Sequence, residues 1–395
     1  MSGPLAGVKV LDLSRVLAGP WATQMLADLG ADVLKIERPG VGDDTRAWGP
    51  PFVAPSDGSR GDAAYFVSAN RSKRSVVLDF ANPEDVALIR RLAERADVLV
   101  ENFKVGGLAK YGLDYPSLVP GNAKLVYCSI TGFGQFGPYA QQPGYDFIVQ
   151  GMSGLMSITG EAEGAPMKVG VAVCDLFTGL YAASAILAAL RHAERTGQGQ
   201  HLDAALLDCQ LAALANQAQN YLATGRSPGR LGNAHPNLTP YGPFAAADAP
   251  IIVAIGNDSQ FQALCRVLGA AECSTDPRFA DNPARLANRQ ALTQSLQAYF
   301  ARRPAVEWAA LLNAANVPAG PIRTVGEAFE DAHVQARGLL QDVERADGAR
   351  FRLGTFPVRL SHTPPPPARP PPMLGADTQA ALADWLGEDP AHPDS

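Results

Sequence analysis

The 395 residues of the chain are too many for one hydrophobic core of ordinary size, so two domains are expected. Hydrophobic residues make up 47% and charged residues 18%, and the net charge is −6, which indicates a globular protein and argues against a nucleic-acid partner. Five scattered cysteines without C-x-x-C spacing predict neither a disulfide framework nor a zinc site, and they favour a reducing cytoplasm.

The first third of the chain alternates between predicted strands and helices, and no signal-peptide pattern precedes it. Asn82 and Pro83 have the residue types that cap and begin a helix. The alternation predicts a parallel sheet covered on both faces. Strands are expected at 8–14, 31–38, 75–80, 97–103 and 124–130, and helices at 20–29 and 82–96.

The middle of the chain is dominated by a long Ala-rich helix that follows Asp175 and ends near Gly197. Its apolar part, residues 176–190, is shorter than the roughly 20 residues that a membrane span needs, so no membrane partner is expected. A strand at 201–206 and another helix that ends near Leu222 follow.

A change of composition near Arg226 marks a predicted domain boundary. Residues 225–244 are rich in Gly, Pro and Asn, which is typical of a linker or an active-site loop. A β-like segment at 349–360 and an extended polyproline segment at 364–372 come near the end. We predict a large domain over 1–225, a small domain with its preceding loop over 226–330, and a C-terminal segment, 331–395, that returns to the large domain.

Asp175 is a lone carboxylate between two apolar runs, with no histidine, lysine or second acid within a helical turn. The strand-like residues 171–174 precede it, so the local pattern predicts an N-cap, since Asp accepts hydrogen bonds from the first free N–H groups of a helix. A catalytic carboxylate is the alternative.

The common nucleotide and hydrolase motifs fail in this sequence. Residues 132–137 spell G-x-G-x-x-G, but Pro138 and Pro143 prevent the helix that a dinucleotide site requires. An active-site loop or a plain turn remains for this segment. No G-x-S-x-G elbow, Walker loop or metal-type histidine spacing occurs, so no metal is expected.

Basic residues follow several of the predicted strands. In an open α/β sheet these loops meet at the ligand crevice, where Arg and Lys suit phosphate groups. Ordinary solvated surface charge is the alternative for each of them. The residues are Arg38, Arg71, Lys73, Arg74, Lys104 and Lys110.

Together these segments resemble the class III CoA-transferases (CaiB/BaiF type), a family that also contains α-methylacyl-CoA racemases. The match runs nearly end to end through "LDLSRVLAGPWATQMLADLGADVLKIERPGVGDDTR", "NRSKRSVVLD", "VLVENF", "SITGFGQFGPYAQQPGYDFIVQGMSGLM", "VGVAVCDLFTGLYAASAILAAL", "RTGQGQ", "VPAGPI" and "MLGADT". The resemblance implies an α/β fold, with a large Rossmann-like open parallel-sheet domain, a smaller α+β domain and an interlocked homodimer.

The resemblance assigns the nucleophile to Asp175. Its carboxylate would take CoA as an aspartyl thioester, so no permanently bound cofactor is needed and the CoA thioester is a substrate. We expect the helix N-terminus to keep Asp175 ionised, and small residues such as Gly179 and Ala182 to let a bulky thioester approach.

For CoA itself the family pattern carries over to Arg38, Lys73, Arg74, Asn102 and Phe103. Lys110 stands where relatives often have Arg. Acyl-CoA and small carboxylic acids are therefore the expected partners, in a cytoplasmic enzyme.

The acceptor acid is addressed by a second set of residues. Leu17 replaces the Gln of formyl-CoA transferase, which argues against oxalate and formate. Arg46, Arg230 and His235 are candidates to meet the far carboxylate of a dicarboxylic acid, with succinyl-CoA as the donor. Each of the three has a structural role as its alternative.

Tyr145 separates the two activities of the family. The racemases carry "GHD" where this chain has "GYD", and tyrosine, with an ordinary pKa of about 10, is a poor base at neutral pH. The sequence therefore favours a transferase, with a 2-methylacyl-CoA racemase as the alternative.

Overall fold

The structure is a computed structural model that describes residues 3–387. The chain divides into two compact units. The larger unit takes the described residues of Met1–Leu155, Lys168–Arg226 and Gln335–Ser395, and the smaller takes Met156–Met167 and Ser227–Val334. The division differs from the predicted one at residues 156–167 and 331–334, which group with the smaller unit, and at Arg226, which groups with the larger one. Residues 388–395 of the predicted C-terminal segment lie outside the described part.

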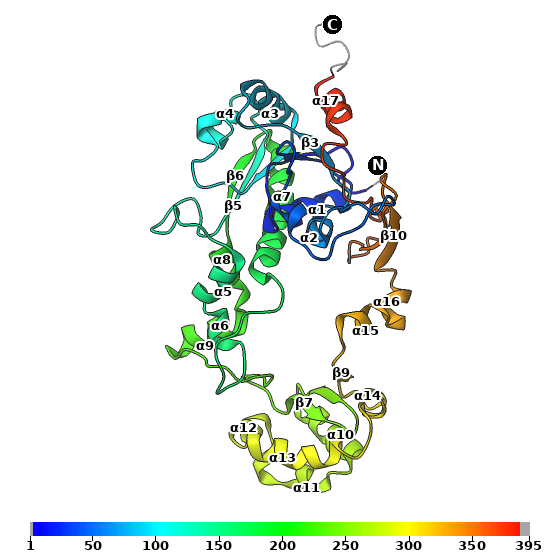
Figure 1. Ribbon diagram of the computed structural model, residues 1–395. Coiled ribbons are helices and arrows are strands. Elements are labelled where there is room, and N and C mark those ends of the chain that lie inside the picture. Colours follow the sequence, from blue (N-terminus) through cyan, green and yellow to red (C-terminus); the bar gives the residue numbers. More distant parts are fainter. Residues whose placement is uncertain (1–2, 388–395) are drawn as a thin grey trace. The chain divides into compact units, whose positions relative to one another are not determined.

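The larger unit is built on a six-stranded parallel sheet with the strand order β3-β2-β1-β4-β5-β6 (Figure 1). Each pair of neighbouring strands is parallel. This strand order is that of the Rossmann fold. Its strands are β1 (Lys9–Asp12), β2 (Asp32–Glu37), β3 (Arg74–Val77), β4 (Val98–Glu101), β5 (Val126–Thr131) and β6 (Gln200–Ala205).

Two hydrophobic clusters fill the two faces of this sheet. Successive strand residues point to opposite faces, so Val10 joins one cluster and Leu11 the other. One face is covered by α1 (Ala18–Asp28) and α7 (Val173–Thr196), and the other by α3 (Pro83–Arg95) and α17 (Thr378–Leu386). The doubly covered sheet predicted from the strand–helix alternation is thus confirmed.

Helix α3 begins as its sequence predicts. Asn82 is the N-cap, its side chain accepts a hydrogen bond from the N–H of Glu84, and Pro83 is the first helical residue. The unit also contains shorter helices: α2 (Ala64–Ala69), α4 (Tyr115–Leu118), α5 (Asp146–Met152), α8 (Leu206–Ala213) and α9 (Ala215–Thr224), with 3-10 turns at Asp44–Ala47 and Ala109–Tyr111.

Helix α7 is longer than the apolar stretch suggested, with 24 residues. Among the described helices it alone is long and apolar enough to cross a membrane, and nearly half of its most apolar stretch is buried. It packs on α1, β5, β6 and α8, which is the position of a core helix. Gly179 permits this packing, since a Cβ there would lie 2.9 Å from the carbonyl oxygen of Ala18.

The C-terminal part of the larger unit forms a hairpin of β10 (Leu340–Glu344) and β11 (Arg350–Gly354). Residues 364–372 contain neither helix nor strand, as their prolines predict. The segment is held by backbone hydrogen bonds of Ala368 with the Gln341 side chain and of Arg369 with Ser72.

The smaller unit is α+β, with its own hydrophobic cluster. Its antiparallel sheet has the order β7-β8-β9. The elements are β7 (Tyr241–Ala245), β8 (Pro250–Ala254), β9 (Ala319–Pro321), α10 (Asp258–Leu268), α11 (Ala271–Thr275), α12 (Asn282–Ala287), α13 (Arg289–Phe300), α14 (Ala305–Ala314), α15 (Val325–Phe329) and a 3-10 turn at Pro277–Phe279. Short helices α6 (Leu155–Ile158) and α16 (Ala332–Ala336) lie where the two units meet in sequence.

Candidate active site

A cavity of about 620 Å³ opens in the larger unit beside the carboxyl ends of β1, β4 and β5. The strand order reverses between β1 and β4, and ligands of open α/β sheets bind at such a point. Its walls are Arg15–Ala18, Asn102–Gly107, Lys110, Tyr111, Ile130–Gly132, Ala140–Tyr145, Asp175 and Leu206. The cavity thus gathers the loops that follow three strands around the one carboxylate in its wall.

Asp175 lies in the first turn of α7 as its third residue. The predicted strand over 171–174 does not form, and Asp175 is not the N-cap, because the helix begins at Val173 after Ala172. The capping role belongs to Asp146, whose carboxylate accepts a hydrogen bond of 2.8 Å from the N–H of Cys174. Helix α5 therefore caps α7, and the side chain of Asp175 is left free.

The carboxylate of Asp175 has no hydrogen-bond or ion-pair partner within residues 3–387. Burial, together with the smaller effect of the negative charge of Asp146, raises its pKa to about 7. The expectation that the helix N-terminus keeps it fully ionised is therefore wrong. A partly buried carboxylate without a counter-charge is a reactive group, and such perturbed groups in a cavity are typical of functional sites.

Two backbone segments of the cavity wall are clamped together by Asn102. Its Oδ1 accepts from the N–H of Arg15 at 2.9 Å, and its Nδ2 donates to the carbonyl of Arg15 at 2.7 Å. The next residue, Val16, has φ +72°, a costly conformation for a β-branched side chain. The strained turn places Leu17 in the wall of the cavity.

The glycine-rich loop after β5 also reaches the cavity. Gly132 and Gly144 line it and touch, since a Cβ on Gly132 would lie 2.6 Å from the Cα of Gly144. No helix begins between the end of β5 and Asp146, so the loop does not open a helix as a dinucleotide site requires, and its place in the cavity wall fits an active-site loop.

Three basic side chains line the cavity: Arg15, Lys104 and Lys110. Arg15 lies over the ring of Phe103 and forms an ion pair with Asp44 at 2.9 Å. Arg38 shares Asp44, at 2.6 Å, but does not line the cavity. Sequence reasoning missed Arg15, although a basic residue just after the first strand was the available signal.

The other predicted CoA-binding cations are used inside the unit. Lys73 is fully buried, and its ammonium contacts Asp12 at 3.0 Å. Arg74 forms ion pairs with Asp32 and Asp384. Neither residue lines the cavity, because each is committed to carboxylates of its own unit.

The predicted acceptor residues are distributed between the two units. Arg46 is buried and bound to Glu37 at 2.7 Å and to Asp62 at 2.9 Å, so its guanidinium is not free for a substrate. In the smaller unit, Arg230 donates to the carbonyls of Glu161 and Gly164, and the His235 ring packs on that of Tyr241. Tyr145 and Leu17 line the cavity around Asp175.

Gly179 and Ala182 face α1 in the core, so they serve helix packing and not the approach of a thioester. Ala182 belongs to the hydrophobic cluster on that face of the sheet. This corrects the expectation from the sequence, where the small residues following Asp175 pointed to the active site.

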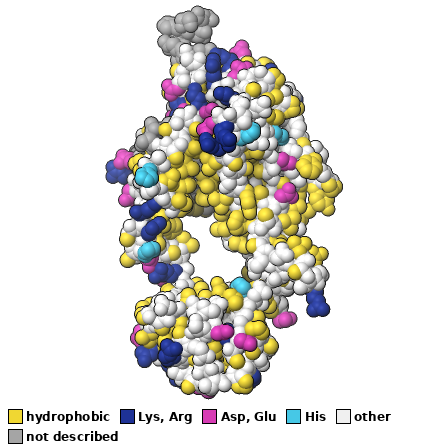
Figure 2. All heavy atoms as spheres, turned by 180° about the vertical axis from the view of Figure 1, so that it is seen from behind, with side chains coloured by type: hydrophobic (Ala, Val, Ile, Leu, Met, Phe, Trp, Pro, Cys, Tyr) yellow, Lys and Arg dark blue, Asp and Glu magenta, His cyan; other side chains and the backbone are white. Residues whose placement is uncertain are grey.

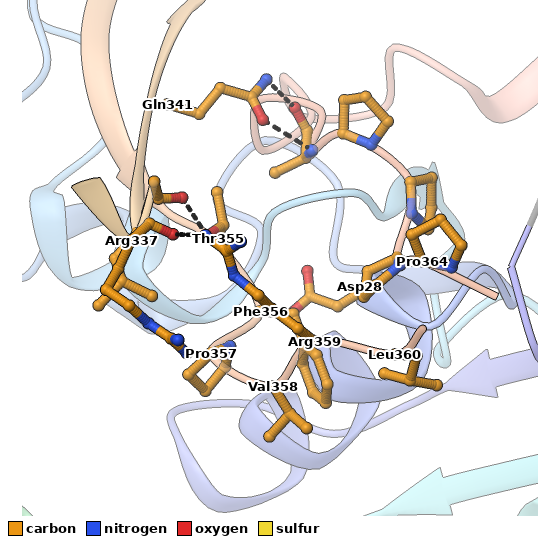
Figure 3. Close-up of a pocket in the computed structure, with 16 residues that line it drawn as sticks. Asp28, Arg337, Gln341, Thr355, Phe356, Pro357, Val358, Arg359, Leu360 and Pro364 are labelled. Atoms are coloured by element: carbon orange, nitrogen blue, oxygen red, sulfur yellow. Dashed lines mark hydrogen bonds between the residues drawn. The ribbon is translucent and has the colours of Figure 1, made fainter. Parts of the chain in front are cut away.

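A second cavity, of about 470 Å³, lies between the hairpin, the proline segment and the end of α1 (Figure 3). Its one carboxylate, Asp28, is bound by two hydrogen bonds from Arg71. The Arg359 side chain donates to the backbone carbonyl of Arg337, so this cation of the lining is also partly engaged. Because its acid is already paired, this cavity is a poorer candidate for catalysis.

The described residues contain no group of three or more His, Cys, Asp or Glu side chains that fits a metal ion.

Comparison with known proteins gives one consistent family. A sequence profile described as "CoA-transferase family III" matches residues 5–378. The chain is 55% identical to a succinate–glutarate CoA-transferase of Agrobacterium fabrum over 96% of this chain and 95% of that protein. It is 41% identical to a succinyl-CoA:glutarate CoA-transferase of Mus musculus over 98% and 87% of the two chains.

A solved structure agrees with these matches. The crystal structure of a CaiB/BaiF family protein from Brucella suis superposes with a TM-score of 0.86 at 50% identity, covering 98% of this chain and all of that one.

Proposed function

Since the chain belongs to CoA-transferase family III, we propose that it moves CoA from succinyl-CoA to a short dicarboxylic acid through Asp175. The observation that carries the proposal is the unpartnered carboxylate of Asp175 in the wall of a cavity large enough for a thioester. The two relatives reported above are named as transferases for glutarate, a dicarboxylic acid, which supports a dicarboxylic acceptor.

The reaction is a sequence of acyl exchanges on one carboxylate. An oxygen of Asp175 attacks the thioester carbonyl, the C–S bond breaks, and a mixed anhydride and CoA thiolate form. The thiolate attacks the aspartyl carbonyl of the anhydride, which releases succinate and leaves CoA as a thioester on Asp175. The acceptor carboxylate attacks that thioester and expels the thiolate, and the thiolate then takes the acceptor's acyl group and frees Asp175. In each step one thioester or anhydride bond breaks as another forms, so the cycle consumes no reagent besides the acyl-CoA and the acceptor acid.

The cavity supplies this cycle with a partly buried nucleophile and with cations for CoA. A bound acyl-CoA would displace water from Asp175, and its carboxylate is a better nucleophile when its lone pairs are less hydrated. Arg15, Lys104 and Lys110 are placed to attract the phosphates of CoA, with Arg38 beside them through Asp44. Asn102 and Phe103 give the wall its shape and apolar contact. We do not propose Lys73 and Arg74 as CoA contacts or Arg46 as an acceptor contact, because all three are paired with carboxylates of the larger unit.

The acceptor contacts stay a proposal. Arg230 and His235 are retained as candidates for the far carboxylate, with Leu17 and Tyr145 bordering the acyl group. Five free cysteines suit a reducing compartment such as the cytoplasm.

An interlocked homodimer is the assembly that we propose. Large hydrophobic side chains are exposed on α5 and α7, and hydrophobic side chains form broad areas on the larger unit in Figure 2. Exposed apolar surface of this kind marks an association site. The residues are Phe147, Ile148, Met152, Leu180, Tyr181 and Leu187.

The test is a transfer assay with succinyl-CoA and a panel of short dicarboxylic acids, read by mass spectrometry, with Asp175→Ala alongside. A new acyl-CoA from the natural chain and none from the variant supports the proposal and names the acceptor. Exchange of the α-proton of a 2-methylacyl-CoA in deuterated water, without any transfer, would overturn it in favour of a racemase.

A further inference from the structure

Glu101 is a buried acid next to the cavity that the transfer mechanism does not use. It ends β4, is 6% exposed, and has no ion-pair partner among the described residues. An uncompensated buried carboxylate is costly to the fold, so its contacts must serve a purpose.

The carboxylate of Glu101 is bonded to the loop that lines the cavity. Its Oε2 accepts from the N–H of Phe103 at 2.7 Å, and Phe103 and Asn102 are both part of the cavity wall. Asn102 in turn clamps the backbone of Arg15. Glu101 therefore fixes the first turn of a loop whose next two residues position two cavity walls.

On its other side Glu101 is bonded to a path that leads to solvent. Ser129 lies opposite it on β5 and forms a hydrogen bond with it. The hydroxyl of Ser129 is 2.9 Å from Nε2 of the exposed His201 on β6. When Glu101 is ionised, Ser129 donates to it and His201 donates to Ser129. When Glu101 is protonated, both bonds run in the opposite sense.

We propose that Glu101 is a positioning residue for acyl-CoA: its ionised carboxylate holds the Asn102–Phe103 turn in the binding conformation, and Ser129 and His201 connect it to solvent protons. The inference rests on the proposed function, since it assigns this cavity to CoA. A hydrogen bond to a carboxylate is stronger than one to a neutral acid, so the turn is held less firmly when Glu101 is protonated.

Glu101 is the group bonded to this turn that changes charge close to neutral pH; Asp175, which lines the same cavity and has a similar pKa, is present in every variant compared below. Burial raises its pKa to about 7, although bonds from Ser129 and Phe103 oppose the rise. Burial also raises the pKa values of the Tyr127 phenol and the Cys128 thiol on β5 far above neutral, with Glu101 adding to both. Burial lowers the pKa of His201, so its ring is neutral. On β1, Asp12 lies opposite Val100 and so faces the other side of the sheet.

The experiment measures the dissociation constant of CoA by titration calorimetry, without acceptor, for the full-length natural chain and three variants. Glu101→Leu leaves the Phe103 N–H unpaired and is expected to weaken binding about tenfold or more. Glu101→Gln keeps an acceptor, so binding weakens about fivefold near pH 8, and the two proteins converge near pH 6, where Glu101 is itself protonated. Glu163→Gln, the matched control, makes the same change at an exposed acid outside the cavity lining, and its binding should stay within about twofold of the natural chain at both pH values.

The outcomes separate the inference from the function on which it rests. A natural chain that does not bind CoA overturns both. Binding by the natural chain with an unchanged constant in Glu101→Gln at every pH overturns the positioning role alone, even if the melting temperature falls. Glu101→Gln keeps this decision possible if Glu101→Leu does not fold.

Discussion

The carboxylates buried at the sheet of the larger unit and the carboxylate beside its cavity differ in how their charge is compensated. Asp12 accepts from Ser14 and Thr23 and contacts Lys73, while Asp43 pairs with Lys35 at 2.9 Å. Burial alone would raise the pKa of Asp12, but the two ammonium groups bring it below its ordinary value. Asp175, beside the cavity, has none of these partners, and its pKa rises to about 7.

The contrast shows that compensation, more than burial, separates a structural acid from a reactive one. The compensated group also supports the reactive one. Ser14 donates its backbone N–H to Asp12. Two residues on, the strained Val16 donates its N–H to both carboxylate oxygens of Asp43. The ion network thus holds the turn that places Leu17 in the cavity.

The largest effect is expected from removing the uncompensated acid. Asp175→Ala should lower the rate of CoA transfer by about 10³-fold or more, because no other carboxylate lines the cavity to take its place. Mass spectrometry of acyl-CoA products measures it. Transfer at more than a tenth of the natural rate would remove the nucleophile from Asp175.

Asp175→Asn serves as the stability control for that experiment. The pKa in the folded chain is raised from 3.8 to about 7, so the folded state holds the proton more tightly than the unfolded state. Stability is therefore lost as pH rises through this window. The melting temperature of the natural chain should fall relative to that of Asp175→Asn as pH rises, and parallel curves would contradict the raised pKa.

The compensated group should instead respond in stability. Lys73→Met removes the ammonium group that contacts Asp12 and leaves only Lys35 to compensate its buried charge, so we expect the free energy of unfolding to fall by about 3–5 kcal/mol. Denaturant titration measures it. A variant as stable as the natural chain that binds CoA weakly would return Lys73 to the CoA site.

A smaller effect is expected from removing the charge of Asp146, which should lower the pKa of Asp175 toward its ordinary value. Transfer requires its carboxylate form, so kcat/KM should rise with pH through about 7 and level above it. Asp146→Asn keeps an acceptor for the N–H of Cys174 but removes a negative charge. The midpoint of the profile should then fall by about half to one pH unit, and an unshifted midpoint would leave burial as the sole cause.

The smallest effect is expected at the edge of the cavity. Lys110→Ala should raise the KM for acyl-CoA about two- to fivefold at low salt, with kcat unchanged, because an exposed cation contributes modestly and is screened. The difference should shrink at high salt. Steady-state kinetics at two ionic strengths measure it, with Lys124→Ala, remote from the cavity lining, as the matched control.

Much of the sheet and part of the cavity could be predicted from the sequence. Local patterns indicated the strands, the Asn82 cap, and the placing of Asn102 and Phe103 after a strand. The roles of Lys73 and Arg46 could not be predicted, because a sequence displays a charge but not its partner. Asp12 precedes its partner Lys73 by 61 residues in the sequence. Asp146, which caps α7 in place of Asp175, precedes its partner Cys174 by 28 residues.

The cap of α7 has a consequence for how the site can be observed. The amide of Cys174 is protected from solvent exchange only while α5 is docked and the Asp146 carboxylate accepts the hydrogen bond of its N–H. Its exchange rate therefore reports, without any substrate, the fraction of molecules whose nucleophile helix is complete. Hydrogen exchange at this one amide thus measures how much of the protein is competent for catalysis before any reaction is run.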